Sequence, residues 1–366
     1  MTTGHEGWLK SAVDLHARSL VVDTHVDTTQ RLLDPKWDFG SRHRFGHVDL
    51  PRLREGGVDA VFFAVFAMGP VEAGAGVRAA WGQIERIGQL AARHASDVVL
   101  ARTADDVRQA RRDGRIAVLI AVEGGHLIED SLDVLREYRE AGATYLTLTH
   151  GAHTGWADSS GIHEPLAPMH GGLTEFGREV VRELNRLGMM VDVSHVSDDT
   201  FRDVMRTSAA PVVATHSSCR AVALQRRNLT DDMIRAIADS GGVVQINFSA
   251  GFVDPDFPHI DTKTFERWWK LPEEQRGKLT DHMTPLSLLV DHVDHAVQLV
   301  GPEHVGIGSD FDGVYALPEG MEDCSKLPSL TAALLERGYA ADDLRKVLGE
   351  NVLRVMDACT AVARVS

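Results

Sequence analysis

Several strand-like apolar runs of this chain end in side chains that can bind a metal ion. The first run, residues 21–27, ends in His25 and Asp27. In an extended segment residues i and i+2 point the same way, so this imidazole and this carboxylate can approach one ion together. One such pair would by itself indicate only a hydrogen-bonded turn. The pattern recurs along the chain, however, and the strand-end set is His25, Asp27, Glu123, His150, His195, His216 and Asp310.

The set contains imidazole and carboxylate but no thiolate, which is typical of catalytic zinc or a related divalent ion. Because it is too large for one ion, we expect two metals that share a bridging carboxylate. Glu123 is the expected bridge, since Gly124 and Gly125 leave the backbone room beside it. A carbamylated lysine, the bridge of some barrel hydrolases, is not expected because no lysine lies between Lys36 and Lys263.

The elements that must position these residues alternate between apolar runs and helical patterns. The apolar runs are residues 21–27, 58–66, 116–122, 143–149, 189–193, 212–214, 243–248 and 305–310. The helical patterns are residues 76–92, 132–140, 174–187, 233–238 and 286–299. This alternation predicts a (β/α)8 TIM barrel, an α/β fold whose strand ends converge on one C-terminal mouth. A doubly wound open sheet is the alternative, but a glycine-rich phosphate loop would usually follow its first strand, where His25-Val26-Asp27 stands.

We expect residues 1–366 to form a single domain with an insertion at 252–283, which is predicted to be a loop with short helices over one face. This insertion is a candidate for a lid or for a subunit contact, so the sequence allows a homodimer. Trp268 and Trp269 within it are interpreted as lid packing.

The composition narrows the class of partner. The 366 residues are 43% hydrophobic and 25% charged, as in globular proteins. A net charge of −15 argues against nucleic acid, which needs concentrated Lys and Arg, so we expect a small-molecule substrate. No run of about 18 apolar residues predicts a membrane span. The three cysteines form no C-x-x-C motif, and no signal peptide is recognised, so a cytoplasmic location is expected.

Other polar residues receive simpler interpretations. Asp192 and Asp312 are predicted to orient ligating imidazoles. The histidines in polar or helical segments are expected to be solvated: His5, His16, His43, His94, His292 and His295.

The sequence resembles the renal (membrane) dipeptidase family of metallopeptidases, within the amidohydrolase-like barrels, over essentially the whole chain. The motifs that carry this resemblance are Asp23-Thr24-His25-Val26-Asp27, Val122-Glu123-Gly124-Gly125, Leu148-Thr149-His150, Trp156-Ala157-Asp158-Ser159, Asp192-Val193-Ser194-His195, Thr215-His216-Ser217-Ser218, Arg227-Asn228-Leu229-Thr230 and Gly306-Ile307-Gly308-Ser309-Asp310-Phe311-Asp312-Gly313.

The resemblance implies a zinc-dependent dipeptidase with two zinc ions per chain. It implies a first zinc held by His25, Asp27 and Glu123, and a second held by Glu123, His195 and His216. It also implies that His150 and Arg227 contact the substrate. Dipeptides with a D residue at the C-terminal position, and β-lactam rings, are further substrates that it implies.

On this basis we expect Asp310 to take a proton from the attacking water and to pass it to the leaving amine. His150 is expected to hydrogen-bond the oxyanion, and Arg227 to clamp the free C-terminal carboxylate. Two alternatives are open: another hydrolase on the same metals, namely a lactonase, deaminase or phosphotriesterase, or a non-catalytic barrel that only binds a ligand.

Overall fold

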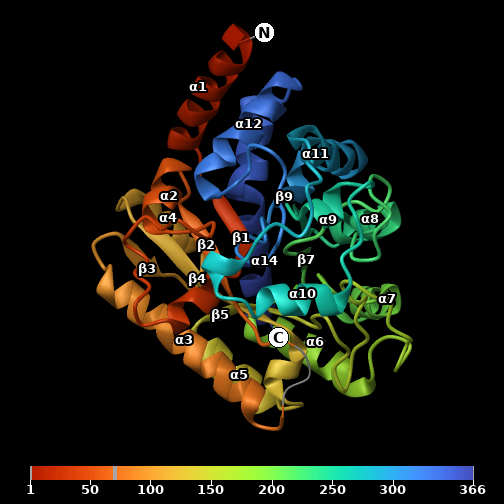
Figure 1. The fold of residues 1–366 in the computed structure, drawn as a ribbon. Coiled ribbons are helices and arrows are strands. Elements are labelled where there is room, and N and C mark those ends of the chain that lie inside the picture. Colours follow the sequence, from red (N-terminus) through yellow and green to blue (C-terminus); the bar gives the residue numbers. More distant parts are fainter. Residues whose placement is uncertain (1, 69–71, 366) are drawn as a thin grey trace.

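The computed structural model describes residues 2–68 and 72–365, and its centre is a ring of parallel strands (Figure 1). The strands neighbour one another in chain order, and each neighbouring pair is parallel. They are β1 (Val22–Val26), β2 (Ala60–Val65), β4 (Ile116–Glu123), β5 (Ala143–Thr147), β6 (Met190–Asp192), β7 (Val212–Ala214), β8 (Val243–Ile246) and β9 (Val305–Ile307). All the predicted strands are confirmed. A further strand, β3 (Val98–Leu100), pairs with the start of β4 and was not predicted, because three residues, two of them half-buried, leave little pattern.

Hydrogen bonds between the segment after β9 and the end of β1 bring the two ends of the sheet together. The backbone N–H of Asp310 donates to the carbonyl of His25 over 3.0 Å, and that of Asp27 donates to the carbonyl of Phe311 over 2.8 Å. The Asp23 carboxylate accepts the backbone N–H of Ser309 at 2.9 Å. The barrel therefore closes at the point where the predicted site residues His25 and Asp27 meet Asp310.

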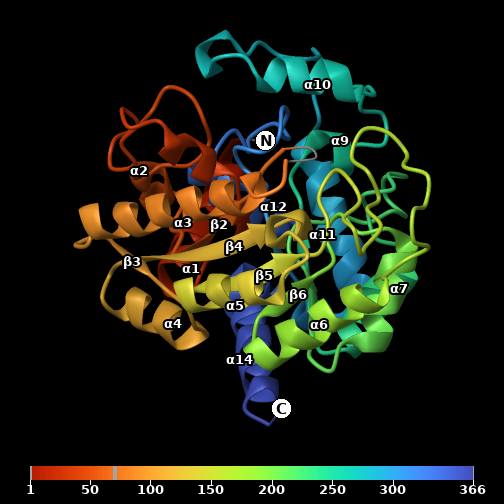
Figure 2. The same ribbon diagram turned by 90° about the horizontal axis from the view of Figure 1, so that it is seen from below.

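The helices surround the strands (Figures 1 and 2). They are α1 (Thr2–Arg18), α2 (Leu50–Glu55), α3 (Ala75–Arg93), α4 (Ala104–Arg112), α5 (Leu132–Ala141), α6 (Glu175–Leu187), α7 (Asp198–Thr207), α8 (Asp231–Asp239), α11 (Leu286–Val300), α12 (Leu327–Glu336), α13 (Ala341–Arg345) and α14 (Asn351–Ala363). Hydroxyl side chains begin several of them; for example, Ser197 accepts the N–H of Thr200 and Thr230 accepts that of Met233. The five predicted helices are confirmed, and none of the described helices is both long and apolar enough to cross a membrane.

The two ends of the barrel are covered differently. At one end, Leu353 and Met356 of α14 belong to the same buried apolar cluster as Phe62, Leu119 and Tyr145 of the strands. At the other end lies the insertion, with α9 (Ala250–Val253), α10 (Thr262–Trp269) and the single turn η3 (Glu273–Gln275). Figure 2 shows α10 on the opposite side of the molecule from the end of α14. The short helices predicted for residues 252–283 are present, while the lid role and the single-domain assignment stay predictions.

Two histidines expected to be solvated are buried, so that prediction is wrong for them. His16 is 2% exposed and bridges the carbonyl of Gly56 and the hydroxyl of Thr331. His292 is 0% exposed, and its Nδ1 accepts the N–H of Cys219 over 2.9 Å. Both lie on helices, where a polar residue in the apolar pattern does not reveal a partner from a distant segment. His43, His94 and His295 are half-buried, and the side chain of His5 lies outside the described part.

Candidate metal centre and active site

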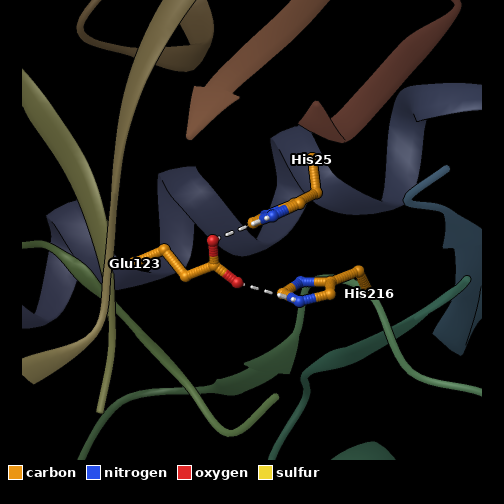
Figure 3. Close-up of side chains that lie close together, drawn as sticks. All are labelled: His25, Glu123 and His216. Atoms are coloured by element: carbon orange, nitrogen blue, oxygen red, sulfur yellow. Dashed lines mark ion pairs between the residues drawn. The ribbon is translucent and has the colours of Figure 1, made fainter. Parts of the chain in front are cut away.

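Glu123, the last residue of β4, stands between imidazoles that come from different strand ends. Its carboxylate is 2% exposed. One oxygen, Oε2, lies 3.4 Å from Nε2 of His25, and the other, Oε1, lies 3.1 Å from Nε2 of His195 and 3.3 Å from Nε2 of His216. Figure 3 shows the two oxygens pointing in different directions, toward His25 and toward His216. This is the arrangement that a bridging carboxylate needs.

The other predicted residues lie beside this carboxylate. Asp27 Oδ1 is 3.4 Å from Nε2 of His25, and His150 Nε2 is 3.8 Å from Oε1 of Glu123. Asp310 lies within 4.8 Å of ligand atoms of both His25 and Asp27. All seven strand-end residues are therefore brought together at one mouth.

Three overlapping groups of possible metal ligands share these side chains. They are His25, Glu123 and His216; Glu123, His150 and His195; and His25, Asp27 and Asp310. Glu123 belongs to two of the groups and His25 to two. The overlap extends the donor set beyond what one ion could use, as a two-metal centre requires.

Buried atoms without a hydrogen-bond partner test whether these residues fit a metal. His25 Nε2, Asp27 Oδ1 and Glu123 Oε2 are three such atoms. Leaving buried polar atoms unsatisfied is costly, and a cation would satisfy all three at once. Imidazole nitrogens with carboxylate oxygens are ligands that zinc accepts, so the residues present fit the group.

Tyr145 fixes which nitrogen of His25 faces this centre. Nδ1 of His25 lies 2.8 Å from the Tyr145 hydroxyl, and that hydroxyl donates to the carbonyl of Thr24 over 3.0 Å. The hydroxyl must therefore accept from Nδ1–H, which leaves the Nε2 lone pair directed at Glu123 and Asp27. The sequence did not reveal this role, because Tyr145 stands in the middle of an apolar run and has the pattern of a core residue.

A second relay orients His216. Its Nδ1 lies 2.9 Å from the hydroxyl of Thr215, which donates to Asp192 over 2.7 Å. Asp192 also accepts the hydroxyl proton of Thr147 at 2.6 Å. The orienting role predicted for Asp192 is thus exerted through Thr215.

Asp312 has a different role from the one predicted. Its carboxylate accepts from the hydroxyl of Thr28 over 2.6 Å, from Arg31 over 2.9 Å and from the backbone N–H of His47 over 2.7 Å. Although burial opposes ionisation, the charge of Arg31 helps to lower the pKa of Asp312 to about 2. Asp312 therefore binds Thr28, Arg31 and His47 at the edge of the mouth, and we call these four residues the rim. It does not orient a predicted metal-binding imidazole.

The backbone at the site adopts conformations that most residues avoid. His195 has φ 69°, Asp310 has φ 64° and Asp312 has φ 72°, all in the left-handed region. Gly313 has no room for a side chain, because a Cβ there would lie 2.1 Å from Oδ2 of Asp27 and 2.6 Å from Oδ1 of Asp310. The glycine of the Asp310-Phe311-Asp312-Gly313 motif thus lets two acidic groups of the site approach the chain.

The charges of the site favour cation binding. Burial opposes ionisation of Glu123, but His25 and the other imidazoles hold its pKa well below the usual range. Burial lowers the pKa values of His195 and His216, which keeps both rings in the neutral form that can bind a metal. Burial, together with the charge of Glu123, raises the pKa of Asp310 to about 6.

Arg227 lies against the backbone of His216 and does not line the main cavity. It is 3% exposed, and its guanidinium donates to the Ser217 hydroxyl over 2.7 Å and to the His216 carbonyl over 2.9 Å. Its Nε is buried without a hydrogen-bond partner. The structure thus places Arg227 against the backbone of a predicted ligand, with one donor unused.

A cavity that is partly open to solvent leads to the predicted ligands. A concave site of this kind suits a small molecule rather than a folded protein. Its inner side includes Asp27, Glu123, His150, His195 and Asp310, while apolar residues of the insertion and neighbouring loops line most of the rest.

Comparisons with known proteins agree with this geometry. The model of the membrane dipeptidase family, peptidase family M19, matches residues 9–366. The dipeptidase verJ of Clonostachys rogersoniana is 39% identical over 330 residues, which cover 87% of this chain and 78% of that protein. The dipeptidase aclJ of Aspergillus oryzae is 37% identical over 328 residues, with 87% and 72% covered.

A solved structure supports the same assignment. The metallopeptidase from Rhodobacter sphaeroides, liganded with a phosphinate mimic of the dipeptide L-Ala-D-Ala, is 30% identical. The match has a TM-score of 0.81 and covers 93% of this chain and 99% of that one. Family model, relatives and fold therefore coincide: the chain belongs to the membrane dipeptidase family, peptidase family M19, and is a metallopeptidase of the dipeptidase type.

Proposed function

We propose that this enzyme binds two zinc ions at its mouth and hydrolyses the peptide bond of dipeptides, including those with a D residue at the C-terminal position. The observation that carries the proposal is the position of Glu123 between His25 and the pair His195 and His216. His25, Asp27 and Glu123 would hold one ion, and Glu123, His195 and His216 the other. The mimic of L-Ala-D-Ala bound by the Rhodobacter sphaeroides relative supports the choice of substrate.

Zinc ions in such a site supply the acidity that makes water a nucleophile at neutral pH, and they polarise the scissile carbonyl. Asp310 would accept a proton from the attacking water and deliver it to the leaving amine. Its Oδ2 is held at 2.9 Å by the amide of Asn247, and its side chain lines the cavity close to His25 and Asp27. A fixed carboxylate next to the reacting atoms can move a proton in both directions.

His150 would stabilise the oxyanion that forms at the scissile carbonyl. It lines the cavity, and its Nε2 lies close to Glu123, at the border between metal site and open space. Burial lowers the pKa of His150, so its ring is neutral and can donate one hydrogen bond.

Arg227 would bind the C-terminal carboxylate of the dipeptide. Its unpartnered Nε–H is one donor available for this contact. Because Arg227 does not line the cavity, the clamp requires the guanidinium to turn from Ser217 toward the substrate.

The experiment that tests the proposal is turnover of an L-L and L-D dipeptide library by zinc-loaded and metal-stripped enzyme. We expect cleavage that depends on zinc and includes L-D dipeptides. A zinc-loaded protein that cleaves none of them, but opens lactones or phosphoesters, would contradict the dipeptide assignment.

We also propose that the protein works in the cytoplasm. The support is that Cys219, Cys324 and Cys359 are all free and buried, which fits a reducing compartment. The homodimer that the sequence allows stays a prediction.

A further inference from the structure

The cavity has two chemically different sides. The side nearest the predicted ligands carries its acidic groups, Asp27, Glu123 and Asp310. Aromatic rings form much of the remaining lining, and we call Phe66, Phe257, Phe265, Trp269 and Tyr315 the aromatic wall.

The aromatic wall is continuous and begins at the predicted substrate ligand His150. The His150 ring centroid lies 5.8 Å from that of Phe66, which lies 6.3 Å from that of Trp269. From Trp269 the centroid distance is 5.8 Å to Phe265, and from Phe265 it is 5.9 Å to Tyr315. The rings therefore follow one another in contact from His150 to Tyr315.

Ion pairs and hydrogen bonds tie the wall to the rim of the site. Arg276 donates to the carbonyl of Trp269 over 2.6 Å, and its guanidinium carbon lies 4.9 Å from the Trp269 ring centroid. Glu273 of η3 forms an ion pair with Arg31, which also bonds Asp312 over 2.9 Å. Arg276 thus holds Trp269 where it lines the cavity, and Glu273 of the same insertion is tied to Arg31.

The chemistry of the wall selects what can lie against it. Phe257 and Phe265 are each 8% exposed, and both line the cavity. An apolar side chain gains by leaving water here, whereas an anionic one would lose its hydration with no lysine or arginine among the lining residues to pair with. His163, which also lines the cavity, lies against Phe265 with a ring-centroid distance of 4.6 Å.

We propose that the aromatic wall is a specificity pocket for one side chain of the dipeptide, and that it makes the enzyme prefer substrates with an aromatic or long aliphatic residue. The inference rests on the proposed dipeptidase function and adds its substrate class. A hydrophobic pocket discriminates between two substrates that differ by one methylene group by about 10- to 200-fold. We therefore expect kcat/KM for the better of Phe-Ala and Ala-Phe to exceed that for Ala-Ala by roughly 10-fold or more.

Adjacent tryptophans on α10 offer a matched pair of variants. Trp269 lines the cavity, whereas Trp268 is outside its lining and donates its indole N–H to the carbonyl of Gly277 over 2.7 Å. Trp269→Ala should lower the Phe-to-Ala selectivity ratio by about 10-fold, while Trp268→Ala should leave that ratio within about 2-fold of the wild-type value. Zinc content and Tm of both variants show whether they remain folded.

A charged variant at the same position tests the pocket even if Trp269→Ala destabilises α10. Trp269→Glu should raise kcat/KM for the better of Lys-Ala and Ala-Lys, relative to the corresponding Phe dipeptide, by about 10-fold or more, because it places a negative charge against the substrate side chain.

Equal kcat/KM of the wild type for Ala-Ala and both Phe dipeptides would overturn the pocket assignment while leaving the dipeptidase function standing. Equal effects of Trp268→Ala and Trp269→Ala on the ratio would overturn it as well. If the zinc-loaded wild type cleaves no dipeptide, the proposed function fails, and the inference fails with it.

Discussion

The hydroxyl of Tyr145 lies 2.8 Å from Nδ1 of His25 and gives its own proton to the carbonyl of Thr24. A phenol inside the barrel thereby sets the tautomer of a predicted metal ligand. Two strands, β1 and β5, are coupled by this contact at the depth of the site. The relationship matters because a ligating imidazole needs its second nitrogen held.

Tyr145→Phe should weaken zinc binding by about 10- to 100-fold, because the Nδ1–H of His25 loses its acceptor. Competition with a chelating dye measures the zinc affinity. Tyr138→Phe is the matched control, since Tyr138 is also fully buried and donates to a backbone carbonyl, that of Leu127, over 2.8 Å. Equal zinc affinity in Tyr145→Phe and Tyr138→Phe would show that the phenol does not support the ligand.

Asp310→Asn should keep its metal and lose turnover by about 100- to 10,000-fold, because the amide cannot carry the proton from water to the amine. Zinc content and kcat are measured on the same sample. A variant that still turns over at more than a tenth of the wild-type rate would remove Asp310 from the proton path. A variant that loses zinc would instead assign Asp310 to metal binding.

Arg227→Ala should lower kcat/KM for a dipeptide by about 10- to 100-fold and have little effect on the corresponding dipeptide amide, because only the free carboxylate uses the charged hydrogen bond. The ratio of the two kcat/KM values isolates the clamp from general damage. Arg226→Ala is the control, since Arg226 is the exposed neighbour. If Arg227→Ala affects acid and amide equally, the side chain only supports the backbone of His216.

The sequence was sufficient to predict the barrel and the clustering of the strand-end side chains for a physical reason. Parallel strands buried on both faces are continuous apolar runs, so a polar residue at their end is conspicuous. Glu123 and His216 were recognised in this way. The sequence pattern could not predict contacts that depend on packing between distant segments. Examples are the hydrogen bond between Tyr145 and His25 and the partners of His16 and His292.

The contacts at the rim of the site could not be predicted from the sequence either. Asp312 follows Asp310 closely, and the motif alone could not show that its carboxylate turns to Arg31. The neighbouring tryptophans of α10 look alike in sequence, and only the fold separates Trp269, which lines the cavity, from Trp268. Arg227 was assigned through family resemblance, since an arginine in a basic loop has no pattern of its own.

The stability of the protein should fall below pH 6.5 partly through His292. Burial lowers the pKa of His292 to about 4 in the folded chain, against about 6.5 when unfolded. The unfolded state therefore binds the proton first, and up to about 3 kcal/mol of folding free energy is lost as pH falls from 6.5 to 4.

Urea unfolding of wild type and His292→Gln between pH 4.5 and 7.5 measures this contribution. Glutamine can still bond the N–H of Cys219 and the carbonyl of Val253 but does not titrate. The difference in unfolding free energy between the two proteins should shrink as pH falls. A difference that stays constant with pH would exclude His292 as a source of acid instability.

The most direct test of the two-metal centre is the number of zinc ions bound per chain by wild type and by Glu123→Ala, measured by elemental analysis after dialysis at fixed free zinc. Because Glu123 lies between both sets of imidazoles, we predict two ions in the wild type and fewer than one in the variant. A wild type that binds one ion, or a variant that keeps two, would contradict the central role of Glu123.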